Sequence, residues 1–373
     1  MRIHSIASYK HCSVPRQFSL GVSYIFGREN LTEITRANGH RLDGILPLGE
    51  PPMPEPQPTD NDVSFDLETG LSAVRSLKSK VPSDAHSARN LGTEREGNAV
   101  LIDENGTLVT IGYLITEATD VSIGGTNGKE IPAQVVGYDH RTGFGLVRTV
   151  EPLGLKHLTI ASNVDELLPD NKVVIAAAGG VPASILGKVE DRREFAGSWE
   201  YLIDKAIFTT PLHPRWSGGA LIDPASGFLL GIGSLFVQDP GGKEEDNQGN
   251  QGNMFVPADL LLPIFNELVT TGRAQSLAKP WLGMQTTEAM GHLVVSGIHD
   301  GGPADKADIQ VGDIIEEIES HLIDNLSDMY RKIWAVGGAG ADVSLRVTRG
   351  SHQLDIVIRS GDRHDYLKVP QRH

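Results

Sequence analysis

One short stretch of the chain, residues 213–223 (HPRWSGGALID), has residue types that could carry out acyl transfer. Ser217 stands before an apolar run and is followed by two glycines, which is how several hydrolases present a nucleophilic hydroxyl. Serine and glycine are also ordinary turn residues, so the same letters fit a plain strand-entry turn. A working nucleophile further needs a base, a carboxylate that orients the base, and donors for the oxyanion. Whether Ser217 is a nucleophile or an ordinary turn residue therefore depends on whether the sequence provides these other groups.

The composition narrows the class of protein. The chain has 373 residues, 42 glycines and a formal net charge of −15. The length predicts two or three domains, and the glycine content predicts many turns. The acidic balance argues against nucleic acid or an anionic membrane as the main partner, because both attract basic surfaces. The single cysteine, Cys12, excludes an intrachain disulfide and a thiolate zinc site.

The N-terminal region predicts neither a membrane span nor a leader. A transmembrane helix needs about 20 consecutive apolar residues, and the sequence has no such run. The first residues are basic but lack a sustained apolar core, so a secretory signal is not predicted and a cytoplasmic location is expected. Residues 1–64 end in a proline-rich acidic run, which predicts a disordered extension and a flexible tether.

Residues 65–275 read as short strands separated by turn residues. The pair Asn105-Gly106 is a strong hairpin signal between two apolar runs. Regular short strands with glycine turns predict barrels or sandwiches rather than a parallel α/β sheet. Residues 257–272 have helical spacing and end at Gly272, a typical helix stop.

Residues 276–363 predict a separate small domain, followed by a tail at 364–373. A helix is expected at 326–337, with Leu326, Met329, Ile333 and Val336 on one face, before a terminal hairpin. This unit resembles a PDZ domain over residues 280–361, because the run GGPADKADIQVGDII is similar to the PDZ pattern SPAxxAGLxxGDxI. Asp308 stands where that pattern usually has glycine.

The PDZ resemblance implies a peptide-binding site. Residues 281–284 (WLGM) lie where the family has its carboxylate-binding loop, in which successive backbone N–H groups hold a terminal carboxylate. The residues implied in peptide binding are Trp281, Leu282, Gly283, Met284, Met329 and Ile333. Two alternatives stay open: Trp281 and Leu282 could be core residues only, or the chain itself could block the groove and leave a non-binding structural unit.

The order of the two units resembles the HtrA (DegP-like) serine proteases. The segments VVGYDHRTGFGLVR (residues 135–148) and HPRWSGGALIDPASGFLLGIGS (residues 213–234) are similar to that family's segments around the catalytic carboxylate and the nucleophile. The resemblance implies a mainly β chain, with a two-barrel trypsin-like (chymotrypsin-fold) domain followed by an α+β PDZ domain. It places Ser217 at the nucleophile's position, and it implies a trimer and a periplasmic location.

Three departures from the family pattern predict that Ser217 is inert. Tyr113 takes the histidine's place, and a phenol with a pKa near 10 stays protonated at neutral pH. Gly143 replaces the aspartate, and Arg215 replaces the glycine whose N–H completes the oxyanion hole. Loss of a triad member costs roughly four to six decades of turnover. The sequence therefore predicts a pseudoprotease that binds extended or C-terminal peptide segments as an adaptor or sensor.

The rival hypothesis is an active serine endopeptidase with a displaced base. Two histidines are candidates for this base: His213 lies four residues before Ser217, and His140 lies close in sequence to the lost carboxylate. To accept the serine proton, either ring would have to lie within about 3 Å of the hydroxyl. His140, His157 and His213 show no spaced ligand pair, so neither a metal nor a cofactor is expected. The aromatic residues Phe195, Trp199 and Tyr201 are expected to pack together.

Overall fold

The computed structural model describes residues 53–126, 128–242, 251–274 and 278–368, with the backbone of two short paired strands, β1 (Arg36–Ala37) and β2 (His40–Arg41). Most of the predicted N-terminal extension lies outside the described residues. The expected flexible tether is wrong for residues 53–64, because their backbone finds partners on the second barrel. The Pro56 carbonyl accepts a 2.8 Å hydrogen bond from the Leu186 amide, and Met53 packs on the core there.

The first barrel is closed by six antiparallel strands in the order β3-β4-β5-β8-β7-β6. A short helix, α2 (Leu67–Ser72), leads into it, and η1 (Gly112–Leu114) follows β5. All five residues of β5 are buried. The strands are β3 (Val74–Lys80), β4 (Glu94–Leu101), β5 (Thr107–Ile111), β6 (Asp120–Gly124), β7 (Glu130–Tyr138) and β8 (Phe144–Thr149). Asn105-Gly106 lies in the β4–β5 hairpin, as predicted, with Gly106 at φ 80°.

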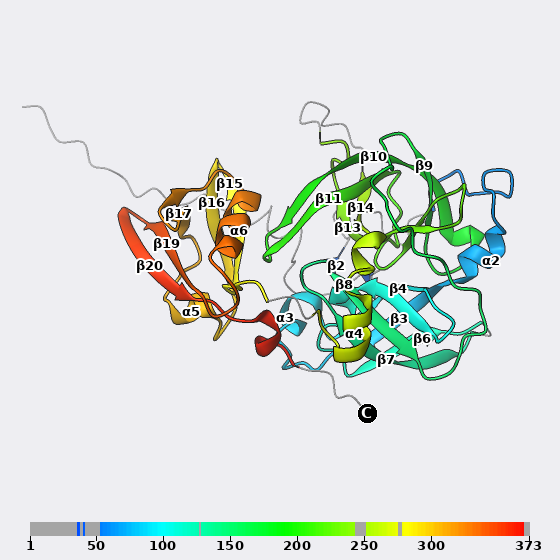
Figure 1. Cartoon of the computed structure of the whole chain (residues 1–373), viewed down its shortest axis with the longest axis horizontal. Coiled ribbons are helices and arrows are strands. Elements are labelled where there is room, and N and C mark those ends of the chain that lie inside the picture. The colour runs from blue at the N-terminus through cyan, green and yellow to red at the C-terminus, as the bar shows by residue number, and fades with distance from the viewer. Residues whose placement is uncertain are drawn as a thin grey trace, which may run out of the picture.

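The second barrel has the strand order β10-β11-β14-β13-β12-β9. Its strands are β9 (Lys172–Ala176), β10 (Ser184–Gly197), β11 (Tyr201–Thr210), β12 (Ala220–Ile222), β13 (Leu229–Val237) and β14 (Gly252–Pro257). Strands β10 and β11 form a long hairpin whose tip reaches toward the C-terminal sheet (Figure 1). The predicted helix after β14 is split into η3 (Ala258–Leu261) and α4 (Phe265–Thr271), and Gly272 ends α4 at φ 81°.

The C-terminal sheet has the order β15-β16-β17-β19-β20, with β18 beside β17, so β15 is an edge strand. The strands are β15 (Met284–Ala289), β16 (His292–Ile298), β17 (Ile314–Ile318), β18 (His321–Leu322), β19 (Asp342–Arg349) and β20 (His352–Arg359). Helix α5 (Pro303–Lys306) is short, whereas α6 (Leu326–Ala335) is capped by Asn325 and buries Leu326, Met329 and Ile333, as the helical spacing predicts.

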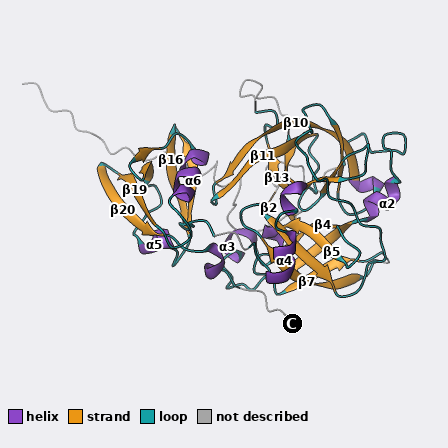
Figure 2. Ribbon diagram, viewed as in Figure 1, coloured by secondary structure: helices purple, strands orange, loops and turns teal. Residues whose placement is uncertain are grey.

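Strands greatly outweigh helices in the described residues, so the mainly β prediction is confirmed (Figure 2). The exact domain boundaries stay predictions. After β20, η4 (Arg363–Tyr366) brings the expected tail back to the first barrel, where α3 (Ala88–Leu91) also lies. The Lys368 amide donates to the Glu117 carboxylate at 2.9 Å. Residues 364–368 are therefore a packed strap rather than a free tail.

Candidate functional site

Ser217 lies in the turn between β11 and β12, where the second barrel meets β4 of the first. Its side chain is only 2% exposed. The Asn98 side-chain amide donates to the carbonyls of Arg215 and Ser217, each at 2.9 Å, and the Asn98 backbone amide donates to Ser217 at 2.8 Å. Gly218 follows at φ 68°, a conformation that favours glycine. The turn that carries Ser217 is therefore held tightly against the first barrel.

Tyr113, on η1 after β5, lies directly against Ser217. Its hydroxyl oxygen is 2.9 Å from Ser217 Oγ and donates its proton to the Ser234 carbonyl at 2.7 Å. A phenol has one proton, so the Ser217 hydroxyl is the donor in the shared hydrogen bond. Burial raises the pKa of Tyr113 above its usual value, although the hydrogen bond with Ser217 lowers it. The group beside the serine is therefore a neutral acceptor rather than a base that is ready to take a proton.

Gly143, between β7 and β8, has a positive φ of 81°, and the space beside it is filled. A Cβ at this position would lie 2.9 Å from the Tyr201 hydroxyl and 3.2 Å from its ring. Tyr201 is anchored there because its hydroxyl donates to the Thr142 carbonyl at 2.8 Å. Tyr201 of the second barrel thus fills the space beside Gly143 of the first barrel. Phe195, Trp199 and Tyr201 pack as an aromatic cluster, as predicted, with the last two rings 5.7 Å apart.

The backbone amide of Arg215 is turned toward His213. It donates to His213 Nδ1 at 3.1 Å, and the other ring nitrogen, Nε2, lies 3.0 Å from the Ala183 carbonyl. Nδ1 is therefore an acceptor and Nε2 carries the proton in the neutral ring. An oxyanion near Ser217 needs donors that are free to face it. In this arrangement the Arg215 amide already has a partner.

Neither histidine that could replace the base is hydrogen-bonded to Ser217 in the described part of the chain. Both ring nitrogens of His213 have the partners given above. The ring of His140 packs between Tyr138 at 5.0 Å and His364 at 4.7 Å. Burial lowers the pKa of both His213 and His140, the latter with help from Arg363 and His364. The structure therefore gives no support to a displaced imidazole base.

The buried His213 gives a pH prediction. Burial lowers its pKa to about 4 from 6.5. Because the folded state binds fewer protons than the unfolded state, this contribution to stability is complete above pH 6.5 and is lost as the pH falls toward 4. At about 1.4 kcal/mol per pKa unit, the loss is at most about 3 kcal/mol.

We expect the free energy of unfolding of His213→Gln to fall less steeply between pH 7 and pH 4.5 than that of the wild type. Urea unfolding at several pH values measures this slope. His292→Gln, at an exposed position of β16, is the control and should keep the wild-type slope. Equal slopes for the wild type and His213→Gln would contradict the burial of a neutral ring.

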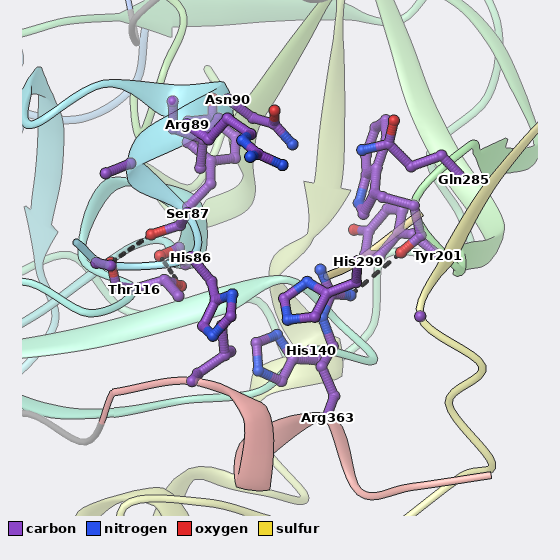
Figure 3. A pocket seen from close by; sticks show the side chains of 18 of the residues that line it. His86, Ser87, Arg89, Asn90, Thr116, His140, Tyr201, Gln285, His299 and Arg363 are labelled. Carbon is purple, nitrogen blue, oxygen red and sulfur yellow. Dashed lines mark hydrogen bonds between the residues drawn. The ribbon is translucent and has the colours of Figure 1, made fainter. Parts of the chain in front are cut away.

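A cavity of about 520 Å³ lies beside Tyr113. Tyr113, Gly143 and Tyr201 line one wall, whereas Ser217 is not among the lining residues. Trp281, Gly283 and Met284 of the PDZ loop and Leu367 of the C-terminal strap also line it. Figure 3 shows His86, His140, His299 and Arg363 around the space. In the described residues, no cluster of three or more His, Cys, Asp or Glu side chains could hold a metal ion.

The predicted carboxylate-binding loop has the expected backbone. Gly283 has φ 73°, and the amides of Leu282, Gly283 and Met284 point to one place. Met329 and Ile333 of α6 are fully buried beside the loop in the core of this domain. Trp281 pairs with Gly361 at the domain's entry and is 8% exposed. The sequence-predicted residues are therefore brought together.

The group that the three amides face is the side-chain carboxylate of Glu200, from the tip of the β10–β11 hairpin. The hydrogen bonds measure 2.9 Å from Leu282, 2.7 Å from Gly283 and 3.2 Å from Met284. Burial raises the pKa of Glu200 to about 7, opposed by these amides and by the charge of Arg363. Sequence reasoning missed Glu200, because a single glutamate in a hairpin turn has no local signature.

The fold defines a trypsin-like double barrel joined to a PDZ domain. Residues 97–232 match the family model of a trypsin-like peptidase domain, and residues 280–359 match that of a PDZ domain. The chain therefore carries a trypsin-like peptidase domain followed by a PDZ domain, and it is similar to proteins named DegP-like and HtrA-type proteases. In the described ranges, every helix is too short or too polar to span a bilayer.

Several proteins with similar sequences or structures are named as proteases of the DegP, Do or HtrA type. A probable periplasmic serine endoprotease, DegP-like, from Halomonas elongata is 22% identical over 285 residues, which cover 73% of this chain and 57% of that protein. Protease Do-like 1, chloroplastic, from Arabidopsis thaliana is 27% identical over 286 residues, covering 70% of this chain and 62% of that protein. A solved HtrA-type protease, AlgW with decapeptide, is 20% identical, covers 82% of this chain and 100% of that chain, and has a TM-score of 0.47. The chain thus spans somewhat more than half the length of these curated relatives.

Proposed function

We propose that this chain is a pseudoprotease of the HtrA family, which binds extended or C-terminal peptide segments through its PDZ domain without cleaving them. The observation that carries the proposal is the pair Tyr113–Ser217. The serine hydroxyl is buried and gives its proton to a phenol oxygen 2.9 Å away, while the phenol gives its own proton to a carbonyl. A serine becomes a nucleophile only when its proton can leave, and a protonated phenol is a poor acceptor for it.

Two further features support an inert serine. The position of Gly143 has no carboxylate and is packed by Tyr201. The Arg215 amide donates to His213 rather than facing the serine. Each feature removes a different requirement of acyl transfer: orientation of a base in the first case and stabilisation of the oxyanion in the second.

A fluorophosphonate probe tests this proposal, because it reacts rapidly only with activated serines. We expect wild type and Ser217→Ala to be labelled equally slowly, at the rate of surface hydroxyls, while a conventional serine protease is labelled in parallel as the positive control. Stoichiometric modification of the wild type that disappears in Ser217→Ala would show a working nucleophile and end the proposal.

The second candidate function is an active serine endopeptidase that uses Tyr113 as the base. The proximity of the two oxygens favours it, as do the names of the relatives. It requires ionised phenol, so cleavage of casein by the purified chain should rise steeply with alkaline pH and disappear in Tyr113→Phe. Cleavage that is absent at every pH excludes this candidate.

Location and assembly complete the proposal. The expected cytoplasmic location finds no support, whereas relatives named periplasmic favour the periplasm. The trimer that the family resemblance implies stays a prediction, and analytical ultracentrifugation of the full chain measures it.

A further inference from the structure

The tip of the β10–β11 hairpin is hydrogen-bonded to the amide loop and to the edge strand of the PDZ domain. Besides the carboxylate of Glu200 in the amide loop, the Ser198 carbonyl accepts a 3.0 Å hydrogen bond from the Thr286 amide on the edge strand β15. A bound peptide adds to a PDZ domain in the same way, with main-chain pairing along an edge strand and a carboxylate held in a nest of amides. The hairpin tip therefore occupies both halves of the peptide site.

Helix α6, which forms the other wall of the groove, also holds the hairpin. The Tyr330 hydroxyl donates to the Gly197 carbonyl at 2.7 Å and accepts from the Glu200 amide at 3.1 Å. Ala196 and Leu202, which face each other across the hairpin, pack against the core of the PDZ domain. The groove thus receives apolar side chains together with the carboxylate, as it would from a peptide with an apolar last residue.

The backbone of Glu200 points to a role for its side chain. Its φ of 58° lies in the left-handed region, where glycine and asparagine are favoured. This residue occupies the last place of a three-residue turn, a position usually taken by glycine. Local turn chemistry therefore disfavours glutamate here. The side chain is 7% exposed, and its charge is compensated by the amide loop and by Arg363.

We propose that the β10–β11 hairpin is an internal ligand of the PDZ domain, with Glu200 in place of a C-terminal carboxylate, and that protein C-termini bind only by displacing it. The displacing partner is a polypeptide with a free α-carboxylate and an apolar last side chain. This inference rests on the peptide-binding part of the proposed function. The neighbouring Tyr201 fills the space at Gly143, so displacement of the hairpin also disturbs the packing of the first barrel.

Variants at the hairpin tip test the internal ligand in the full chain. Glu200→Asn and Glu200→Gly both suit the left-handed backbone, so the hairpin keeps its fold, but both remove the carboxylate that the amide loop binds. The matched control is Asp204→Asn, because Asp204 lies on the same hairpin and contacts Arg331 of α6 at 2.7 Å with a 79% exposed side chain. An exposed pair of this kind contributes little.

The first readout needs no external peptide. Amide hydrogen exchange at Leu282, Gly283 and Met284 should become at least about tenfold faster in both Glu200 variants and stay unchanged in Asp204→Asn. Unchanged exchange in the Glu200 variants overturns the internal ligand. In that case, peptide binding by the wild type would still leave the proposed function standing.

The second readout is binding of a fluorescein-labelled pool of short random peptides that end in valine or leucine, followed by fluorescence polarisation. Both Glu200 variants should bind the free-carboxylate pool at least about tenfold more tightly than wild type and Asp204→Asn, because the groove is open in a larger fraction of molecules. An amidated pool should bind weakly to all four proteins. Faster exchange without any peptide binding overturns the displacement step, and the proposed adaptor function fails with it.

Discussion

We expect Gly218→Ala to lower the free energy of unfolding by about 3–5 kcal/mol, whereas Gly154→Ala costs only about 1–2 kcal/mol. Both glycines have a left-handed backbone, with φ 68° and 65°. A Cβ at Gly218 would lie 1.9 Å from the Asn98 carbonyl oxygen, but a Cβ at Gly154 would meet nothing within 4 Å. Urea unfolding, followed by circular dichroism, measures the free energy of unfolding of each variant. Because both glycines have the same backbone conformation, the difference between the two losses is the cost of the Cβ contact with Asn98.

This comparison bears on the accessibility of Ser217. The turn crosses β4 at Gly218, and the Asn98 amide groups fix the carbonyl of Arg215 and the carbonyl of Ser217 itself. If Gly218→Ala were as stable as Gly154→Ala, the turn would move away from β4 at little cost. The 2% exposure of Ser217 would then be no barrier to a substrate.

Elements with strong local signals could be predicted from the sequence. The glycine at the β4–β5 turn, the stop of α4 at Gly272 and the buried face of α6 follow from short-range patterns, and the structure has all three. The pairing of Tyr113 with Ser217 came from the family resemblance, since the two residues are 104 positions apart. Short-range sequence patterns were therefore enough to predict individual helices and turns, whereas the residues of the site could be brought together only through the resemblance to a known family.

The missed features are contacts between distant segments. The carboxylate of Glu200 meets the amide of Leu282 across 82 positions, and Tyr201 fills the space at Gly143 from the other barrel. Neither contact changes the periodicity or turn chemistry of its own segment. The tether around Pro56 was misjudged for the same reason: its composition predicts disorder when it is considered alone, but the second barrel offers hydrogen-bond partners.

Placing histidine at position 113 and aspartate at position 143 should not by itself give this chain proteolytic activity. For the double variant Tyr113→His with Gly143→Asp, we expect casein cleavage within about tenfold of the same protein carrying Ser217→Ala. An aspartate at position 143 would have to accept φ 81° and a Cβ contact of 2.9 Å with the Tyr201 hydroxyl. As long as Tyr201 fills this space, the aspartate cannot take up the orientation that a catalytic histidine needs.

Two further changes address the remaining obstacles. Tyr201→Ala empties the space at Gly143, and Arg215→Gly allows the amide that now donates to His213 to turn toward the serine. Because one oxyanion donor is worth about 10²–10³ in turnover, we expect the fourfold variant to exceed its Ser217→Ala counterpart by at least about 100-fold. Activity already present in the double variant would contradict this account. Tyr113 and Gly143 would then be the only obstacles to proteolysis, and the packing by Tyr201 and the turned amide of Arg215 would be without catalytic consequence.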